Sequence, residues 1–372
     1  MLTIIVKGTN GCNLACSYCS LGEKKNFKYI NKWSLMDLMN FSCKYAKYQG
    51  ESKINFILHG GEPTLVDPNI YDESITFIKN KYPELEIFIS MQSNGLAITN
   101  QFINIIKKYD IHMGISIDGS QNIHDSERRT AWNKPSYKIV TNNIDRLLCA
   151  GVSVSCLMVL TKNALKEKFD YLTFFEERNL HLKINPLLNY GNVTEHPELI
   201  LEEGDYARYL INLYENIVEK NIDILVSPID NIINGIIHNQ GIRECTFKKY
   251  CNKHFLCIDY KGDIYPCGKF SDMDEMFIGN ISEIPYERID QFLKEKLYER
   301  RNLQLPNICN SCKFIKLCNG GCSAEAMIDG DINEVPIMCK DYKILFEYFH
   351  GAGLKLLKER LIKQKQILEE YI

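Results

Sequence analysis

The sequence has little excess charge, no long apolar run and no repeated unit. Its 44 Lys and Arg face 47 Asp and Glu, which gives a formal net charge of -3, and no basic stripe is interleaved with aromatic residues. This balance argues against nucleic acid as a partner. The apolar run 2–6 ends at Lys7, which is too short for a signal peptide or a membrane span. We therefore expect a cytoplasmic protein without a membrane partner.

Cysteine, by contrast, is abundant, with 15 in 372 residues. In a reducing cytosol, dense cysteines favour metal binding over disulfides. Cys12, Cys16 and Cys19 form a compact group with no fourth cysteine nearby. A structural zinc site, or a cluster that only carries electrons, uses four protein ligands. The triplet therefore predicts a [4Fe–4S] cluster with one iron left open for chemistry.

Strand-like and helix-like segments alternate through the first half of the chain. The predicted strands are 2–6, 54–58, 86–90, 111–117, 152–160 and 181–184, and the predicted helices are 33–48, 71–82, 100–109, 137–150 and 165–177. This order predicts an α/β fold with a parallel sheet, either open and doubly wound or curled into a partial barrel. Polar and glycine-rich loops follow the strands, which favours a partial (β/α)6 TIM-like barrel with its site at the carboxyl ends of the strands.

The remaining sequence divides by composition. We expect a barrel over 1–190, a helical connection over 191–244, a cysteine-rich domain over 245–345 and a C-terminal helix over 346–372. Four cysteines lie in apolar patterns and are expected to be small core residues; they are Cys43, Cys149, Cys156 and Cys257.

Two motifs in the expected order carry a family resemblance. Cys12-x3-Cys16-x2-Cys19 follows the first predicted strand and Gly60-Gly61-Glu62-Pro63 follows the second, as in the radical S-adenosylmethionine (SAM) enzymes. The later cysteines resemble the SPASM extension of that family; they are Cys245-x5-Cys251, Gly262-x4-Cys267, Cys309-x2-Cys312-x5-Cys318-x3-Cys322 and Cys339. The chain is similar to anaerobic sulfatase-maturating enzymes and to SPASM enzymes that modify ribosomal peptides.

The resemblance implies SAM and three [4Fe–4S] clusters as cofactors. The open cluster would bind SAM, and its reduction would release a 5′-deoxyadenosyl radical that removes hydrogen from unactivated carbon. The resemblance assigns Cys245, Cys251, Cys267 and Cys322 to auxiliary cluster I. It assigns Cys309, Cys312, Cys318 and Cys339 to auxiliary cluster II. A non-enzymatic zinc or electron-transfer module is the alternative of a different class.

The resemblance also implies residues around SAM. These are Tyr18, Gly60, Gly61, Glu62, Asn94 and Ser116, and the catalytic candidates are Asp118 and Arg128. Further polar residues expected near the barrel mouth are His59, His124, Arg129, Asn185 and Asp230.

Gly268 separates this chain from the sulfatase-maturating enzymes, which carry an aspartate base after the cysteine of the Gly-x4-Cys element. Unless Asp259, Asp263 or another carboxylate replaces that base, formylglycine formation loses its proton acceptor. We therefore expect an oxidoreductase that matures a ribosomal peptide by a thioether or carbon–carbon crosslink. Sulfatase maturation is the alternative, and a small-molecule oxidase or epimerase on the same scaffold is another. The expected partners are a peptide or protein substrate and a reductant such as flavodoxin or ferredoxin.

Overall fold

The fold is built on one curled sheet. The computed structural model describes residues 1–21, 27–249, 253–271, 273–298, 305–328 and 330–370. The strands of the first half are β1 (Leu2–Lys7), β2 (Lys53–His59), β3 (Glu86–Ser93), β4 (His112–Ser116), β5 (Val154–Leu160) and β6 (His181–Pro186). These strands pair in parallel and in sequence order.

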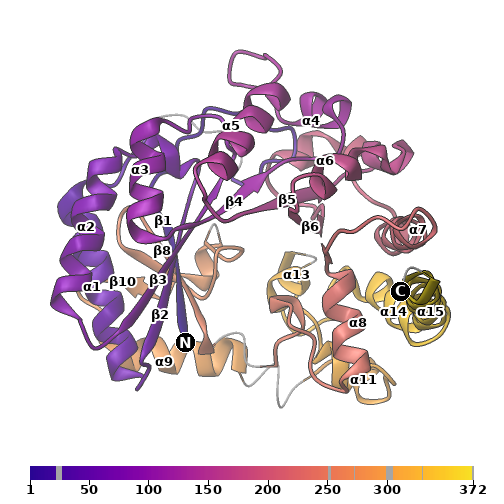
Figure 1. Cartoon of the computed structure of the whole chain (residues 1–372). Helices are drawn as coiled ribbons and strands as arrows, with labels where there is room; N and C mark the ends of the chain where they lie inside the picture. Colours follow the sequence, from indigo (N-terminus) through magenta and orange to yellow (C-terminus); the bar gives the residue numbers. More distant parts are fainter. Residues whose placement is uncertain (22–26, 250–252, 272, 299–304, 329, 371–372) are drawn as a thin grey trace.

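Helices cover the outer face of this sheet (Figure 1). They are α1 (Lys32–Tyr48), α2 (Pro68–Lys81), α3 (Asn100–Tyr109), α4 (Gln121–Glu127), α5 (Tyr137–Cys149) and α6 (Leu172–Glu176). In the order of the described strands the two ends of the sheet are not neighbours, so the barrel is open. The α/β fold with a partial barrel is confirmed.

Side-chain alternation separates the core from the inside of the barrel. Along β1, Ile4 and Val6 are buried in the main apolar core, whereas Ile5 and Lys7 are partly exposed. Because side chains alternate along a strand, the second pair lies on the opposite, inner face. The inner face is therefore partly open, as a barrel that admits a ligand requires.

The second half adds four strands to the same sheet. They are β7 (Val226–Ser227), β8 (Phe255–Asp259), β9 (Asp263–Tyr265) and β10 (Gly279–Asn280). β7 extends the sheet beyond β6, while β8 pairs in parallel with β1 along Thr3–Lys7. The cysteine-rich segment is thus hydrogen-bonded directly to the first strand, although its sequence suggested a separate domain. The proposed domain boundaries stay a prediction.

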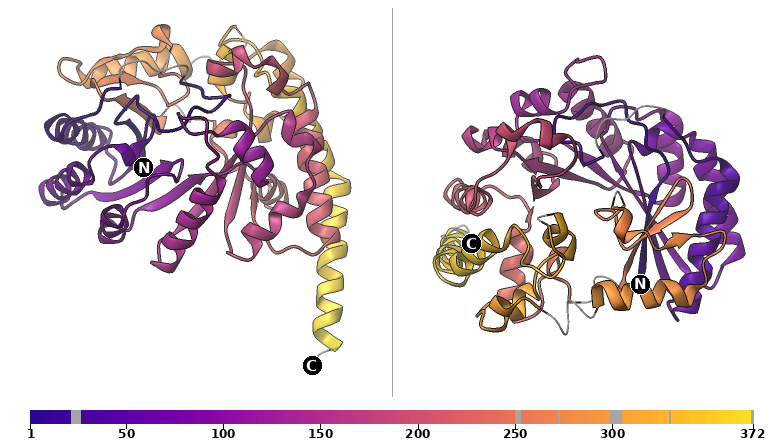
Figure 2. Two further views of the ribbon diagram at one scale, coloured as in Figure 1. Left: turned by 90° about the horizontal axis from the view of Figure 1, so that it is seen from above. Right: turned by 180° about the vertical axis from the view of Figure 1, so that it is seen from behind.

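The later helices pack beside this sheet and are mostly short. They are α7 (Asp205–Glu219), α8 (Ile229–Ile237), α9 (Tyr286–Leu293), α11 (Asn307–Asn310), α12 (Ile315–Cys318), α13 (Ser323–Ile328), α14 (Cys339–His350) and α15 (Ala352–Glu370). Figure 2 shows the end of α15 projecting beyond the rest of the chain. Among the described residues, no helix is long and apolar enough to cross a membrane.

Two expectations about local structure are wrong. The helix expected over 165–177 is two 3-10 turns followed by the short α6, because Glu167 and Lys168 adopt extended backbone. The C-terminal residues are helical, in α14 up to His350 and in α15 from Ala352. Cys149 is exposed, unlike Cys43, Cys156 and Cys257, which are buried as expected.

Candidate active site

The loops after β1 and β2 pack against each other through their backbones. Gly61 N donates to the carbonyl of Thr9 (2.8 Å), and Glu62 N donates to that of Gly11 (2.8 Å). A Cβ atom at Gly61 would lie 1.9 Å from the Gly11 carbonyl oxygen, so no side chain fits there. Gly60 has φ +123°, which also favours glycine. This contact explains the two glycines, and their role in SAM binding stays a prediction.

The Glu62 carboxylate points into the protein. Its Oε1 accepts hydrogen bonds from the amide (3.0 Å) and hydroxyl (2.6 Å) of Thr64 and from the hydroxyl of Ser93 (2.8 Å), and its Oε2 accepts from Asn94 N (2.7 Å). Burial raises the pKa of Glu62, and these hydrogen bonds oppose the rise. The side chain therefore joins the loops after β2 and β3. The SAM contact implied for Glu62 stays a prediction. Because its carboxylate is occupied by these hydrogen bonds, the backbone of Glu62 would make that contact.

Asn94 and Ser116 lie close to the cysteine triplet and to the inner face of the sheet, respectively. Asn94 Nδ2 lies 3.6 Å from Cys12 Sγ and donates to Asn13 Oδ1 (2.7 Å). Ser116 Oγ accepts a hydrogen bond from Gln92 Nε2 (3.1 Å). Asn94 thus reaches the loop that carries the thiols, which the sequence did not indicate.

The three thiols of the triplet lie within one another's electrostatic influence. Burial raises the pKa of Cys12 to about 11 and that of Cys16 to about 12, and the Arg128 cation opposes the rise at Cys16. Buried thiols are poor thiolates by themselves, whereas binding to a cationic metal centre stabilises the thiolate form. The donor set fits a [4Fe–4S] cluster with three protein ligands, held by Cys12, Cys16 and Cys19.

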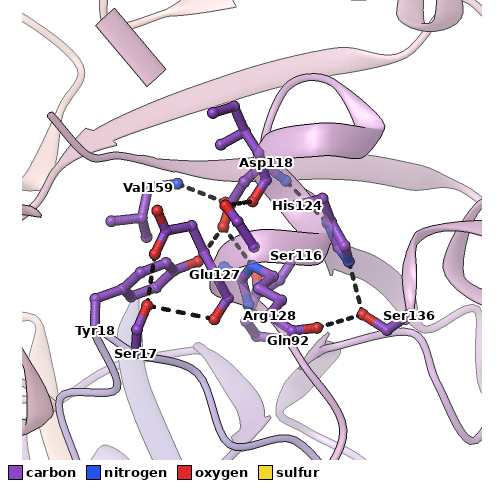
Figure 3. Close-up of polar contacts among 12 residues, drawn as sticks. Ser17, Tyr18, Gln92, Ser116, Asp118, His124, Glu127, Arg128, Ser136 and Val159 are labelled. Carbon is purple, nitrogen blue, oxygen red and sulfur yellow. Dashed lines mark hydrogen bonds and ion pairs between the residues drawn. The ribbon is translucent and has the colours of Figure 1, made fainter. Parts of the chain in front are cut away.

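Asp118 and Arg128 form a buried ion pair beside Tyr18 (Figure 3). Asp118 Oδ2 accepts from Arg128 Nε (2.8 Å) and from the Tyr18 hydroxyl, and Oδ1 accepts from Val159 N (3.0 Å). The guanidinium carbon lies 5.2 Å from the centroid of the Tyr18 ring. The catalytic roles expected for this pair stay predictions. The contacts of Asp118 and Arg128 hold the side chain of Tyr18, which lies between Cys16 and Cys19 in the sequence.

His124 lies on the side of this ion pair that faces away from Tyr18 (Figure 3). Its Nδ1 accepts from Asp118 N (3.2 Å), and its Nε2 lies 3.0 Å from the hydroxyl of Ser136, which donates to the Arg128 carbonyl (2.5 Å). Because the Ser136 proton goes to that carbonyl, Nε2 carries the imidazole proton. Burial lowers the pKa of His124 to about 4, so the ring is neutral. His124 therefore acts as a positioning residue rather than facing the mouth.

The segment after β6 covers the cysteine loop, which sequence reasoning missed. Asn192 N donates to the Cys19 carbonyl (2.9 Å), and Asn192 Nδ2 donates to the Cys16 carbonyl (3.3 Å). A Cβ atom at Gly191 would lie 2.4 Å from the Cys19 carbonyl oxygen. Tyr18 packs in a small apolar cluster with Leu187, Val193 and Leu199. The sequence signal that could have revealed this contact is the Gly191-Asn192 pair, which follows β6.

The four cysteines predicted for auxiliary cluster II line one small pocket. They are Cys309, Cys312, Cys318 and Cys339, and the walls include Phe314, Pro336, Tyr342 and Phe346. These cysteines come from α11, α12, α14 and the turn between α11 and α12. Their convergence in an apolar environment fits a fully ligated cluster. It supports the predicted grouping.

Auxiliary cluster I is described in part, because Cys251 lies outside the described residues. Cys245 and Cys322 both act electrostatically on the ammonium of Lys269, which follows Cys267 by two positions. In the described ranges, no three Cys, His, Asp or Glu side chains could hold a single metal ion. Each thiolate of a [4Fe–4S] cluster binds its own iron, so such ligands lie farther apart than those of one ion.

The other polar candidates have protein partners. His59 Nδ1 accepts from Gly60 N (2.8 Å), and burial together with the charge of Lys7 lowers the pKa of His59 to about 4. Asp230 accepts from Val226 N, and burial raises its pKa to about 6. Arg129 donates to the Asn133 carbonyl (3.1 Å). Asn185 lies near the end of β6.

A cavity of about 650 Å³ lies outside the barrel, between α1 and the turns that follow β8 and β10. Its lining includes Phe41, Asp259, Tyr260 and Tyr286 and contains none of the residues predicted to bind SAM or a cluster. We therefore do not assign it to the active site.

Comparison with known proteins identifies the class. Residues 6–175 match the model of the Radical SAM superfamily, and this part of the chain is a radical SAM domain. The chain is accordingly an enzyme of the radical SAM type, for which SAM and [4Fe–4S] clusters are the expected cofactors.

Two curated relatives are similar over nearly the whole chain. A cysteine-type anaerobic sulfatase-maturating enzyme of Clostridium novyi (strain NT) is 28% identical and covers 93% of this chain and 94% of its own. A serine-type anaerobic sulfatase-maturating enzyme of Bacteroides thetaiotaomicron is 26% identical and covers 98% of this chain and 93% of its own.

Two solved structures share the fold. Native anSMEcpe with bound AdoMet and Kp18Cys peptide has a TM-score of 0.81 at 22% identity and covers 96% of this chain and 99% of its own. Streptococcus suis SuiB bound to precursor peptide SuiA has a TM-score of 0.65 at 17% identity and covers 91% of this chain and 76% of its own.

Proposed function

We propose that this enzyme oxidises a cysteine or serine side chain of a peptide or protein, in the manner of the sulfatase-maturating enzymes. The supporting observation is that the Clostridium novyi relative, a cysteine-type sulfatase-maturating enzyme, aligns over 93% of this chain and 94% of its own. Peptides bound to anSMEcpe and to SuiB support a peptide substrate. The comparisons thus favour sulfatase maturation over the crosslinking expected from the sequence.

The residues of this chain would hold the reacting groups in place. Cys12, Cys16 and Cys19 would bind the cluster, and SAM bound there supplies a radical that removes a hydrogen atom. The Tyr18–Asp118–Arg128 network fixes the cysteine loop, and the segment at Gly191 and Asn192 closes it from the other side. The position of the substrate carbon would then decide which bond reacts.

The substrate chemistry balances as a two-electron oxidation. A cysteine side chain would lose a hydrogen atom from Cβ to the SAM-derived radical, a proton from sulfur to a base and an electron to an auxiliary iron–sulfur cluster, which leaves a thioaldehyde. Water then replaces the sulfur, so that the products are formylglycine and hydrogen sulfide. The proton requires an acceptor. Asp259 and Asp263, which could replace the missing base, both accept hydrogen bonds within the protein. Asp259 Oδ1 accepts from Lys261 N (2.8 Å), and Asp263 Oδ1 accepts from Asn280 Nδ2 (2.8 Å).

Gly268 is the observation that favours a second candidate, a peptide crosslink. Forming a thioether or a carbon–carbon bond also removes two hydrogens but places the proton acceptor elsewhere. The site at Gly268 has room for the missing base. A Cβ atom there would lie 3.4 Å from Ile5 Cδ1 and 3.7 Å from Ile5 Cγ2, which is ordinary van der Waals contact. An aspartate can therefore be introduced without a backbone clash.

The test combines the anaerobically reconstituted enzyme, SAM, a flavodoxin or ferredoxin as cytosolic reductant, and the Kp18Cys peptide. We expect an aldehyde that a hydrazide reagent captures. Gly268→Asp should raise its rate of formation about a hundredfold or more, at the lower end of what general bases contribute, whereas Gly268→Asn should not. A peptide that loses two hydrogens without an aldehyde, and whose fragments resist cleavage across a ring, would establish crosslinking instead. A peptide left unchanged by the wild type and by Gly268→Asp contradicts both candidates for this sequence.

A further inference from the structure

The turn between α4 and α5 lies against the cysteine loop and is open to solvent. Ala15 N donates to the carbonyl of Arg129 (2.8 Å), and Ala131 N donates to that of Asn13 (3.1 Å). Trp132 follows Ala131 and is 78% exposed. A large aromatic side chain is therefore held at the surface, one residue away from a backbone hydrogen bond to the loop that carries the predicted cluster ligands.

A second exposed segment contacts the same loop. Lys28 N donates to Asn10 Oδ1 (2.7 Å). A Cβ atom at Gly11 would lie 3.0 Å from Phe27 Cγ, so the ring of Phe27 lies over the start of the cysteine loop. Phe27 is 47% exposed and Tyr29 is 48% exposed. Two exposed segments with aromatic side chains are therefore in contact with the cysteine loop.

The described segments at this surface are cationic. Residues 7–19, 27–31 and 128–139 contain no Asp or Glu. Their cations are Lys7, Lys28, Arg128, Arg129, Lys134 and Lys138. Of these, Lys28, Lys134 and Lys138 are exposed. The chain as a whole carries a formal net charge of -3, so this local excess of positive charge is opposite in sign to the charge of the whole chain.

The carboxylates that precede the α4–α5 turn in the sequence have partners within the protein. Asp125 Oδ1 accepts hydrogen bonds from the amides of Ser136 and Tyr137 (2.8 Å each). Glu127 is 2% exposed, and its Oε2 accepts a hydrogen bond from the hydroxyl of Ser17 (2.5 Å). These two acidic side chains therefore do not offset the positive charge that the turn presents to solvent.

Exposed aromatic rings among cations fit a protein partner with an acidic surface. Complementary charges speed and orient the association of two proteins, and aromatic side chains provide the anchors of many interfaces. A cluster at the triplet has to receive an electron from outside the chain before it can cleave SAM. An acidic flavodoxin matches both properties, because it carries that electron on the planar, apolar ring of its flavin.

We propose that Phe27, Lys28, Arg129, Trp132 and Lys134 form the surface on which an acidic flavodoxin docks to reduce the cluster at the triplet. One electron leaves the flavin hydroquinone, which becomes the semiquinone, and enters the [4Fe–4S] cluster. No covalent bond forms or breaks, and no proton moves. This inference rests on the SAM-cleaving cluster of the proposed function but not on the identity of the peptide.

The first test measures binding. Oxidised flavodoxin is titrated by calorimetry into the anaerobically reconstituted full chain at low salt. Trp132→Ala should raise the dissociation constant about tenfold or more, as for an aromatic anchor, and Lys134→Glu should raise it about fivefold. Added salt should diminish the effect of Lys134→Glu and preserve that of Trp132→Ala.

Lys107→Glu is the matched control for the change of charge. Lys107 is exposed in the last turn of α3, which leads into the amino end of β4, whereas the cysteine loop follows the carboxyl end of β1. This variant should bind flavodoxin like the wild type. Equal weakening by Lys107→Glu and Lys134→Glu would mean that flavodoxin responds only to the overall charge, and would overturn the inference, as would unchanged binding by Trp132→Ala and Lys134→Glu.

The second test measures SAM cleavage without a peptide. With limiting photoreduced flavodoxin, Trp132→Ala and Lys134→Glu should form 5′-deoxyadenosine more slowly, in proportion to their weaker binding. With dithionite, which needs no docking surface, both should match the wild type.

A loss of rate with dithionite as well would assign the turn to SAM cleavage itself and contradict flavodoxin docking. A raised KM for the Kp18Cys peptide in Trp132→Ala, measured with dithionite and without any change in flavodoxin binding, would make the surface a peptide site instead. A wild-type chain that shows the expected flavodoxin dependence and oxidises no peptide would contradict the proposed function alone.

Discussion

The cysteine loop 12–19 and the cysteine-rich segment 245–339 hold thiols in different ways. The first is one short loop, joined to the strand-end loops and to the segment at Gly191 and Asn192 by backbone hydrogen bonds. The second draws its cysteines from separate turns and short helices that are connected by side-chain contacts such as Lys269–Glu325. Barrel packing therefore fixes the first set of thiols, whereas the second depends more on clusters that join its segments.

The largest effect is expected from removing one thiol in each region. Cys16→Ala should abolish formation of 5′-deoxyadenosine, because the triplet has no spare ligand, while Cys312→Ala should reduce product formation more than SAM cleavage. Chromatography of the nucleoside and of the peptide measures both. Cys149→Ala is the control, since that residue is exposed and lies in neither region. Continued 5′-deoxyadenosine formation by Cys16→Ala would contradict the assignment of the radical site.

A smaller effect is expected from adding one methyl group in each region. Gly61→Ala places a Cβ atom 1.9 Å from the Gly11 carbonyl oxygen, so it should lower the free energy of unfolding by about 3 kcal/mol or more. Gly268→Ala meets ordinary contact at Ile5 and should change it by less than about 0.5 kcal/mol. Urea unfolding of the two variants measures the difference. Equal urea midpoints for Gly61→Ala and Gly268→Ala would show that the loop at Gly61 adapts to the added methyl group. The expected difference in packing between the two regions would then be wrong.

The smallest effect concerns acid. His124 is buried and neutral, with a folded pKa of about 4 against about 6.5 when unfolded. Its contribution is therefore fully present above pH 6.5 and is lost as the pH falls toward 4, by up to about 3 kcal/mol. Hydrogen exchange between pH 7 and pH 5 should show loss of protection around Asp118 and Tyr18 before the 309–339 segment.

His196→Gln is the control for the acid experiment, because His196 is exposed beside Glu198. It should leave the pH dependence unchanged, whereas His124→Asn should flatten it at a lower overall stability. His59 contributes in the same direction as His124, since burial also lowers its pKa to about 4. Protection that is lost first at 309–339 would reverse the order expected for the two regions.

Local pattern predicted much of the barrel because each of its elements carries its own signal. The strands β1 to β6 and the helices α1, α3 and α5 lie within a few residues of their expected positions. α2 begins three residues early because Asp67 caps it and Pro68 occupies its first turn. The triplet was readable because its three ligands lie within one short loop.

The parts that were missed depend on contacts between distant segments. β8 reads as an apolar strand, but only the folded chain shows that its partner is β1. The contact of Asn192 with the Cys16 and Cys19 carbonyls joins two loops with no shared motif. The helix expected over 165–177 gave way to turns in which the Phe169 ring packs against Tyr209, so tertiary packing outweighed helical spacing.

The pairing of β8 with β1 has a mechanical consequence. β1 carries the triplet loop at its carboxyl end, and β8 is hydrogen-bonded along its side; β8 is followed by β9, and Cys267 comes two residues after β9. The separation between the site of radical formation and the region of Cys267 is therefore set by a rigid hydrogen-bond ladder rather than by an adjustable interface. On the predicted cluster assignments, this shared strand would hold the cluster at the triplet and the cluster at Cys267 at a constant distance, on which the rate of electron transfer between them depends steeply.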